Sequence, residues 1–404
     1  MSVNRRTFLK VAAGSISIPA LLKPSVAAQP ALSGAETEHI REQIESHRPS
    51  RLKKLPSEFT ARVGAAHVAG KYHLTSKPFL LEGAEKLLEL GTRLGKFWFM
   101  PHGAAHDYPF NSQWGQYRNF VELAKSEYFT SLFALPFSTI FLEAHSPVEQ
   151  RWRSSGNGPD FYERVTEELY TLTAHLYRTC QQRPITFILQ HWEGDWFVRG
   201  RGGELWNPPP PDWRELCQRM VKWLAARQAG VAKARAEFGR NSKCRVAHAT
   251  EVNRVLDFWN GVPTLVEHVL PNVELDLVSY SAYDGLKDGV TLWRCIEEIR
   301  KHARTGSLFG PGAVCVGEIG RPENEHPEQI AEHWDEWLGA AFASKALYVA
   351  HWELYCNEPS KLGKEVKPPL TDPAQLRGFW LVKPDGSLSV SGKYLAGLWK
   401  RSAG

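Results

Sequence analysis

Short apolar runs alternate with amphipathic segments along most of the chain. Eight of these runs are apolar on both faces, which is typical of strands covered by helices on one side and by a core on the other. They are Arg62–Val68, Lys96–Phe99, Ser138–Ala144, Ile185–Gln190, Arg245–Ala249, Leu275–Ser281, Val314–Gly317 and Ala346–His351.

Between these runs lie segments with the periodicity of amphipathic helices. The two clearest cover residues 161–176 and 213–224, where apolar residues recur every three or four positions. Other helices are predicted near residues 82–90, 116–127, 262–269, 290–303, 327–343 and 391–400. Eight alternations of strand and helix predict a single (β/α)8 TIM barrel with long βα loops. They favour it over an open doubly wound sheet, because Val63–His67 lacks a Gly-rich phosphate-binding turn.

The first 28 residues resemble a twin-arginine signal peptide. Arg5 and Arg6 precede an apolar stretch from Val11 to Leu22, and Ser25–Ala28 supplies small residues for cleavage. The resemblance implies export of the folded protein by the twin-arginine translocase, to the periplasm or beyond the cell. The stretch is too short to span a bilayer, so no stable membrane insertion is expected. We therefore expect a signal peptide at 1–28, an N-terminal arm at 29–60 that packs on the outside, and a catalytic barrel at 61–404.

Charge and aromatic content narrow the choice of ligand. The net charge is +5, but residues 1–28 contribute four positive charges and no negative ones, which leaves +1 on the rest of the chain. A nearly neutral body gives no electrostatic reason to expect binding of nucleic acid or of an anionic membrane. The 15 tryptophans supply flat faces of the kind that hold sugar rings.

The polar residues that follow the strands are the candidates for chemistry, because TIM-barrel active sites lie where the strands end. Glu193 lies just after the fourth strand, and Glu318 ends the nearly apolar seventh strand. Burial disfavours the charged form of such a carboxyl group. Two of them facing each other about 5 Å apart across a barrel mouth supply the acid and the nucleophile that glycosidic cleavage with retention needs.

The order of these residues resembles clan A of the retaining glycoside hydrolases, which are (β/α)8 barrels. In both, a Glu ends strand four, a Tyr follows strand six, a Glu ends strand seven and a Trp ends strand eight. The resemblance implies that Glu193 is the acid/base and Glu318 the nucleophile. It also implies that Tyr283 donates a hydrogen bond to the nucleophile and that Trp352 forms the floor of the sugar subsite.

The reaction so implied is hydrolysis of an O-glycoside in a poly- or oligosaccharide, with net retention through a covalent glycosyl-enzyme and without cofactor or metal. We expect Glu193 to be protonated at rest, with a raised pKa, and Glu318 to be ionised.

The chain departs from the clan at one position. The clan usually has Asn immediately before the acid/base Glu, where it binds the sugar 2-hydroxyl, and this chain has Trp192. Either another group, such as His191 or His248, makes that contact, or the sugar differs there. Asp195 is an alternative proton donor. The full set of candidate substrate-binding residues is Trp352, Trp192, His191, His248, His102, Trp196 and Asp195.

Two other functions remain open. A non-catalytic carbohydrate-binding barrel would use the tryptophans as stacking platforms but would not need both carboxylates. A metal-dependent hydrolase of the amidohydrolase type would use histidines at the strand ends, but the first strand lacks H-x-H and no Asp follows His351 directly. The six cysteines form no C-x-x-C pair, so we predict buried free thiols, with one or two disulfides as the alternative.

Overall fold

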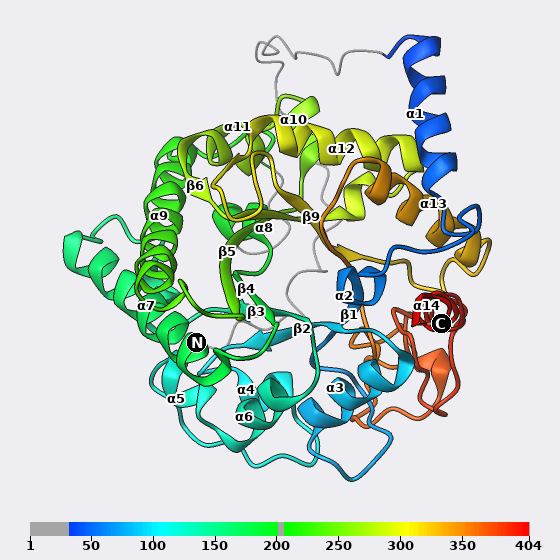
Figure 1. Cartoon of the computed structure of the whole chain (residues 1–404), viewed down its shortest axis with the longest axis horizontal. Coiled ribbons are helices and arrows are strands. Elements are labelled where there is room, and N and C mark those ends of the chain that lie inside the picture. Colours follow the sequence, from blue (N-terminus) through cyan, green and yellow to red (C-terminus); the bar gives the residue numbers. More distant parts are fainter. Residues whose placement is uncertain (1–31, 201–205, 404) are drawn as a thin grey trace.

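The computed structural model describes residues 32–200 and 206–403 (Figure 1). The predicted signal peptide lies outside these residues. Eight parallel strands close into a barrel in the order β1-β10-β9-β7-β5-β4-β3-β2. They are β1 (Val63–His67), β2 (Leu94–Phe99), β3 (Thr139–Ala144), β4 (Thr186–Gln190), β5 (Arg245–Val252), β7 (Leu277–Ser281), β9 (Val314–Ile319) and β10 (Val349–His351). The predicted (β/α)8 barrel is confirmed, and each of the eight predicted runs contributes a strand.

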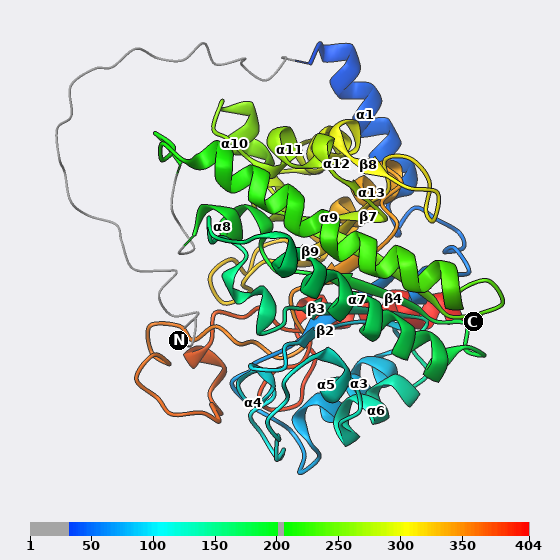
Figure 2. The ribbon, with the colours of Figure 1, turned by 90° about the vertical axis from the view of Figure 1, so that its left-hand side faces the viewer.

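Helices surround this barrel, and α7 and α9 lie side by side on its outside (Figure 2). The longer ones are α3 (Phe79–Leu90), α6 (Glu127–Ala134), α7 (Pro159–Cys180), α9 (Trp213–Phe238), α12 (Gly289–His302), α13 (Ile330–Ala343) and α14 (Val390–Ala403). The shorter ones are α2 (Phe59–Arg62), α4 (Ala104–Asp107), α5 (Phe120–Ala124), α8 (Gly194–Arg199), α10 (Val255–Trp259) and α11 (Leu265–His268), with 3-10 turns η2 (Val148–Arg151), η3 (Leu270–Asn272), η4 (Ala282–Gly285) and η5 (Pro373–Gln375). A separate two-stranded sheet pairs β6 (Glu274–Leu275) with β8 (Arg304–Thr305).

The prediction of one helix over residues 116–127 is wrong. The Asn119 side chain accepts a hydrogen bond from the backbone N–H of Glu122 and begins α5, and the Ser126 side chain accepts one from Phe129 and begins α6. Two N-caps seven positions apart therefore divide the segment into two short helices.

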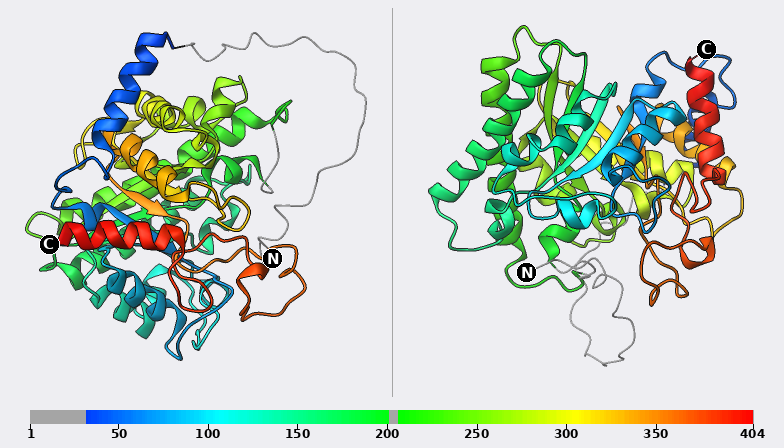
Figure 3. Two further views of the ribbon diagram at one scale, coloured as in Figure 1. Left: turned by 90° about the vertical axis from the view of Figure 1, so that its right-hand side faces the viewer. Right: turned by 90° about the horizontal axis from the view of Figure 1, so that it is seen from below.

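The N-terminal arm carries a helix. Ser33 and Glu36 form a capping box at the start of α1 (Gly34–His47), and α1 packs against α12 and α13 at the edge of the molecule (Figure 3). The backbone N–H of Ser50 then donates to Asp335 of α13 at 2.9 Å. The segment is thereby held on the outside of the helix layer.

Apolar side chains fill the interior of the barrel and support a polar layer above them. Leu94, Phe141, Ile188 and Ala249 belong to one buried cluster inside the barrel. Successive residues of a strand alternate between its faces, so a residue two positions further on also points inward. These next residues are Lys96, Glu143, Gln190 and Glu251. The barrel interior therefore changes from apolar to polar within one step along four neighbouring strands, and three of the four polar residues are charged.

The six cysteines are free and buried, as predicted. Among the described residues, no helix is both long enough and apolar enough to cross a bilayer.

Candidate active site

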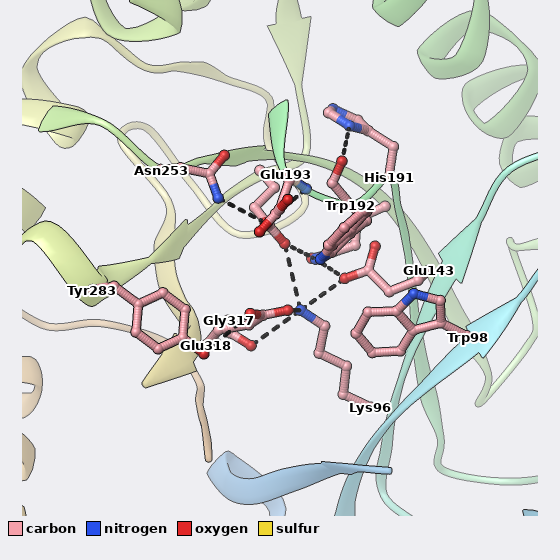
Figure 4. Close-up of polar contacts among 12 residues, drawn as sticks. Lys96, Trp98, Glu143, His191, Trp192, Glu193, Asn253, Tyr283, Gly317 and Glu318 are labelled. Atoms are coloured by element: carbon pink, nitrogen blue, oxygen red, sulfur yellow. Dashed lines mark hydrogen bonds and ion pairs between the residues drawn. The ribbon is translucent and has the colours of Figure 1, made fainter. Parts of the chain in front are cut away.

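A buried lysine lies among three buried carboxylates at this polar layer (Figure 4). The Nζ of Lys96 is 2.7 Å from Glu143 Oε1, 2.9 Å from Glu318 Oε1 and 3.4 Å from Glu251 Oε2. It also donates to the carbonyl oxygen of Gly317 at 3.2 Å. These charges come from β2, β3, β5 and β9, so closure of the barrel brings them together.

One ammonium cannot neutralise three carboxylates in a dry interior. Burial raises the pKa of Glu318 to about 7; Lys96 opposes this shift, and Glu251 and Glu143 add to it. Burial likewise raises the pKa of Glu143 to about 7 against the effect of Lys96. The sequence predicts that Glu318 is ionised at rest. Because its pKa is raised to about 7, this carboxyl group instead gains or loses its proton near neutral pH.

Glu193 follows β4 in a strained backbone conformation. Its φ and ψ of 50° and 63° lie in the left-handed region, which costs a non-glycine residue roughly 1–3 kcal/mol. Its backbone N–H donates to Glu251 Oε1 at 2.8 Å. A Cβ at the next residue, Gly194, would lie 2.0 Å from the carbonyl oxygen of Glu251, so only glycine fits there. The loop that carries Glu193 is therefore pressed against the end of β5.

Tyr283 contacts one of the two candidate catalytic carboxylates directly. It follows β7 in η4, and its hydroxyl donates to Glu318 Oε2 at 3.3 Å. The residue as a whole is 41% exposed, but its hydroxyl faces the protein, where burial and the charge of Glu318 raise its pKa well above the usual value. Glu193 is among the other carboxylates that contribute. The hydroxyl therefore keeps its proton and can donate it in a hydrogen bond to Glu318, beside which Tyr283 lies in Figure 4.

Aromatic side chains border the ion cluster. Trp352 follows β10, is 6% exposed, and has its ring centroid 5.4 Å from that of Trp98. The Nζ of Lys96 is 5.4 Å from the centroid of the Trp98 ring. Trp192, which directly precedes Glu193, is half-buried. Apolar ring surface thus lies beside the charged layer.

The prediction that His191 or His248 replaces the missing Asn is wrong. His248 faces the helix layer, where its Nε2 accepts from Arg227 Nε at 3.1 Å, because it lies three positions before the inward Glu251 and so on the opposite face of β5. His191 is 1% exposed, and its Nε2 is 2.7 Å from Thr250 Oγ1. Neither ring is available to a sugar.

The prediction that Asp195 binds the substrate or donates the proton is also wrong, because groups of the protein itself occupy its carboxylate. It is buried and accepts hydrogen bonds from the backbone N–H groups of Asn253 (2.8 Å), Arg254 (3.2 Å) and Leu265 (2.9 Å). These bonds tie the start of α8 to the segment after β5. Asp195 is a structural tether and neither a binding residue nor the proton donor.

The two remaining candidates lie further along their loops. The half-buried Trp196 ring packs against two guanidinium groups, those of Arg199 and Arg254, whose carbons are 5.6 and 5.2 Å from a ring centroid. His102, in the loop after β2, is exposed, and its ring centroid is 5.9 Å from that of His145.

The strand-end histidines do not converge on a common point. The described residues contain a single group of three or more side chains spaced as metal ligands, namely Glu143, Glu251 and Glu318, and no histidine belongs to it. The Lys96 ammonium lies among these three carboxylates. The arrangement that an amidohydrolase site requires is therefore not formed by the described histidines.

Comparison with known proteins identifies a fold and no family. No known family matches the sequence, and no curated protein matches it either. Among solved structures, the AHE enzyme from Alicyclobacillus herbarius is 13% identical, with a TM-score of 0.53 over 87% of this chain and 98% of that one. A GH5_18 protein from Bifidobacterium longum subsp. longum, in complex with Manb1-4GlcNAc, is 15% identical, with a TM-score of 0.51 over 84% and 78%. The beta-glycosidase BGL167 is 14% identical, with a TM-score of 0.50 over 86% and 97%. At these identities the likeness establishes the (β/α)8 fold alone.

Proposed function

We propose that this protein is a glycosidase that cleaves an O-glycosidic bond with net retention. The observation that carries the proposal is the placement of Glu318, which Lys96 and Tyr283 both contact at the mouth of the barrel. The charge of Glu193, the proposed acid/base, also acts on the pKa of the same tyrosine. The presence of a beta-glycosidase and of a sugar-bound GH5_18 protein among the structures that share the fold supports it.

In the proposed reaction, Glu193 donates a proton to the departing oxygen while a carboxylate oxygen of Glu318 attacks the anomeric carbon. Glu193 then takes a proton from water, the water oxygen attacks the anomeric carbon, and the bond to Glu318 breaks. Tyr283 and Lys96 each bind one oxygen of Glu318 and orient it. When the bond to Glu318 breaks, these two donors stabilise the carboxylate that leaves.

Two other carboxylates lie near Glu318 but do not suit the role of acid/base. Oxygens of Glu143 and Glu251 lie within 4.8 Å of a Glu318 oxygen. The Lys96 ammonium contacts all three, so it occupies the space that a glycosidic oxygen would need. Glu193, outside this ion cluster, is the better candidate.

The carboxylates at the mouth of the barrel favour a substrate without negative charge. Four carboxylates raise the pKa of Tyr283, those of Glu318, Glu358, Glu353 and Glu193, and two of them have a cationic partner, Lys96 for Glu318 and Arg377 for Glu358. A uronic acid or a sulfated sugar would bring a further negative charge to this place. We therefore propose that the substrate is built from neutral sugars.

A screen with aryl glycosides and natural glycans tests the proposal. Wild-type protein should release the aryl group from at least one neutral glycoside and leave aryl glucuronides intact. ¹H NMR of the anomeric proton early in the reaction should show the starting configuration. Product of inverted configuration would contradict the mechanism, and sugar binding without any turnover would support the non-catalytic barrel instead.

The pH dependence of kcat/KM should show an acid limb near pH 7. The nucleophile must be ionised, and burial raises the pKa of Glu318 to about 7, so activity should fall as the pH drops through that value. Because Glu143 titrates in the same range, the observed value belongs to the cluster. Stopped assays from pH 4 to 9 measure it. An acid limb near 4.5, the ordinary value for Glu, would show that burial does not control this carboxylate.

Tyr283→Phe should lower kcat about 10- to 100-fold, because a hydrogen bond to a charged group contributes about 1.5–3 kcal/mol. Steady-state kinetics on the best aryl glycoside measure the loss. Tyr170→Phe is the matched control: Tyr170 donates to Glu237 at 2.7 Å on the helix surface, and its loss should leave kcat unchanged. Equal kcat values for both variants would remove Tyr283 from the mechanism.

We also propose export by the twin-arginine route, to the periplasm or the exterior. The support is the Arg5-Arg6 pair, the apolar stretch and the small residues before position 29. Replacing both arginines by lysine should retain the protein in the cytoplasm, and unchanged export would contradict this route.

A further inference from the structure

Glu251 contacts the backbone of Glu193, the proposed acid/base, and the lysine that binds Glu318, the proposed nucleophile. Its Oε1 accepts from the backbone N–H of Glu193 at 2.8 Å and from Asn253 Nδ2 at 3.1 Å. Its Oε2 accepts from Gln190 Nε2 at 3.1 Å and from Lys96 Nζ at 3.4 Å. The side chain is fully buried, so these bonds are shielded from water.

We propose that Glu251 is a positioning residue that holds the two catalytic carboxylates relative to each other. One oxygen fixes the backbone that carries Glu193, and the other shares with Glu318 the ammonium of Lys96. This inference rests on the proposed glycosidase function and gives a role to a carboxylate that takes no part in bond making.

The backbone of the acid/base loop is held in place by the end of β5. Three consecutive residues of this loop are attached to the end of β5. Glu193 donates to the Glu251 side chain, Gly194 packs against the Glu251 carbonyl oxygen, and Asp195 exchanges hydrogen bonds with Asn253. A left-handed glutamate persists only where its surroundings hold it there. Of these three attachments, the Glu251 side chain is the one that also reaches the Lys96 ammonium.

Glu251 also acts on Glu318 through its charge. The charged and titratable groups that contact or perturb Glu318 are Lys96 of β2, Glu143 of β3, Glu251 of β5 and Tyr283 of η4. The negative charge of Glu251 raises the pKa of Glu318, and Lys96 lowers it. Glu251 therefore influences both the geometry of the site and the pH at which the nucleophile ionises.

Two variants separate these effects. Glu251→Gln can keep an oxygen for the Glu193 N–H but removes the charge, so the acid limb of kcat/KM should move about one pH unit lower. Its amide N–H2 then faces the donors Gln190 and Lys96, so thermal stability should also fall. Glu251→Asp keeps the charge but is one methylene shorter and cannot reach both sides. Its kcat should fall about 10- to 100-fold with little change in KM, while the acid limb stays in place. If Glu251→Gln fails to fold, Glu251→Asp still tests the positioning role.

Glu149→Gln is the control for loss of a buried carboxylate. Glu149 is fully buried in η2, pairs with Arg227 and accepts from Trp223 Nε1 at 3.0 Å, and neither partner belongs to the Lys96 cluster. This variant should lose thermal stability and keep the wild-type acid limb. A wild-type acid limb in Glu251→Gln, or a wild-type kcat in Glu251→Asp, would overturn the inference. Absence of glycosidase activity in the wild-type protein would instead overturn the proposed function, so the two failures are distinguishable.

Discussion

Glu318→Gln should lose turnover by more than about 10³-fold on every substrate that the wild-type protein cleaves, because an amide cannot form the glycosyl ester. Sugar binding should survive, since the substitution preserves the size and shape of the side chain. Glu193→Gln should also lose turnover, but less on aryl glycosides, because a good leaving group departs without a proton. The measurements are kcat on matched aryl and alkyl glycosides and ligand affinity by calorimetry.

Glu323→Gln is the control for these two variants. Glu323 is a buried carboxylate that accepts from the backbone N–H groups of Val390 and Ser391 at 3.1 and 2.8 Å, at the start of α14. It should keep wild-type turnover. Retained turnover in Glu318→Gln would refute its role as nucleophile, and an equal loss in Glu323→Gln would indicate general damage to the fold.

Lys96→Met should destabilise the protein and raise the acid limb of its activity. Removing one partner from a buried ion cluster costs about 3–5 kcal/mol, because the remaining charges stay buried without compensation. The loss of stability should be larger at pH 8 than at pH 5, where protons can neutralise Glu143 and Glu318. The pKa of Glu318 should rise further without the ammonium, so activity at pH 7 should fall.

Two measurements on Lys96→Met test this prediction. Thermal unfolding at pH 5 and pH 8 measures the loss of stability, and the pH profile of kcat/KM measures the shift of the acid limb. Lys86→Met is the control: Lys86 pairs with Glu89 at 2.7 Å on the helix surface, where an ion pair contributes at most about 1 kcal/mol. A Lys96→Met protein with wild-type stability at pH 8 would show that the three carboxylates need no cation.

The strands could be predicted from the sequence because each is a compact apolar run between amphipathic helices. The same reasoning predicts Glu193, Glu318 and Tyr283 as site residues, since residues that follow parallel strands gather at one end of a barrel, and the structure places Tyr283 and Glu318 in contact. It failed for His248, although the alternation of side chains along the strand already excludes this residue from the barrel interior. His248 and Glu251 lie three positions apart, so they cannot both face the interior.

The ion cluster was harder to predict. Lys96 and Glu143 are single charges within apolar strands, and that pattern alone was a usable signal. Their meeting with Glu251 and Glu318 depends on the register of four strands that are distant in sequence, which local patterns do not specify. The tethering role of Asp195 was equally hidden, because its partners belong to a segment that folds back after β5.

The most direct test of the account is to trap the intermediate. Once the screen has identified the sugar, the matching 2-deoxy-2-fluoro glycoside with a good leaving group should accumulate as a covalent adduct on the wild-type protein. Mass spectrometry of the digested protein should place this adduct on the peptide that contains Glu318, and Glu318→Gln should form none. An adduct on Glu193 or Glu143, or turnover with inversion and no adduct, would contradict the account.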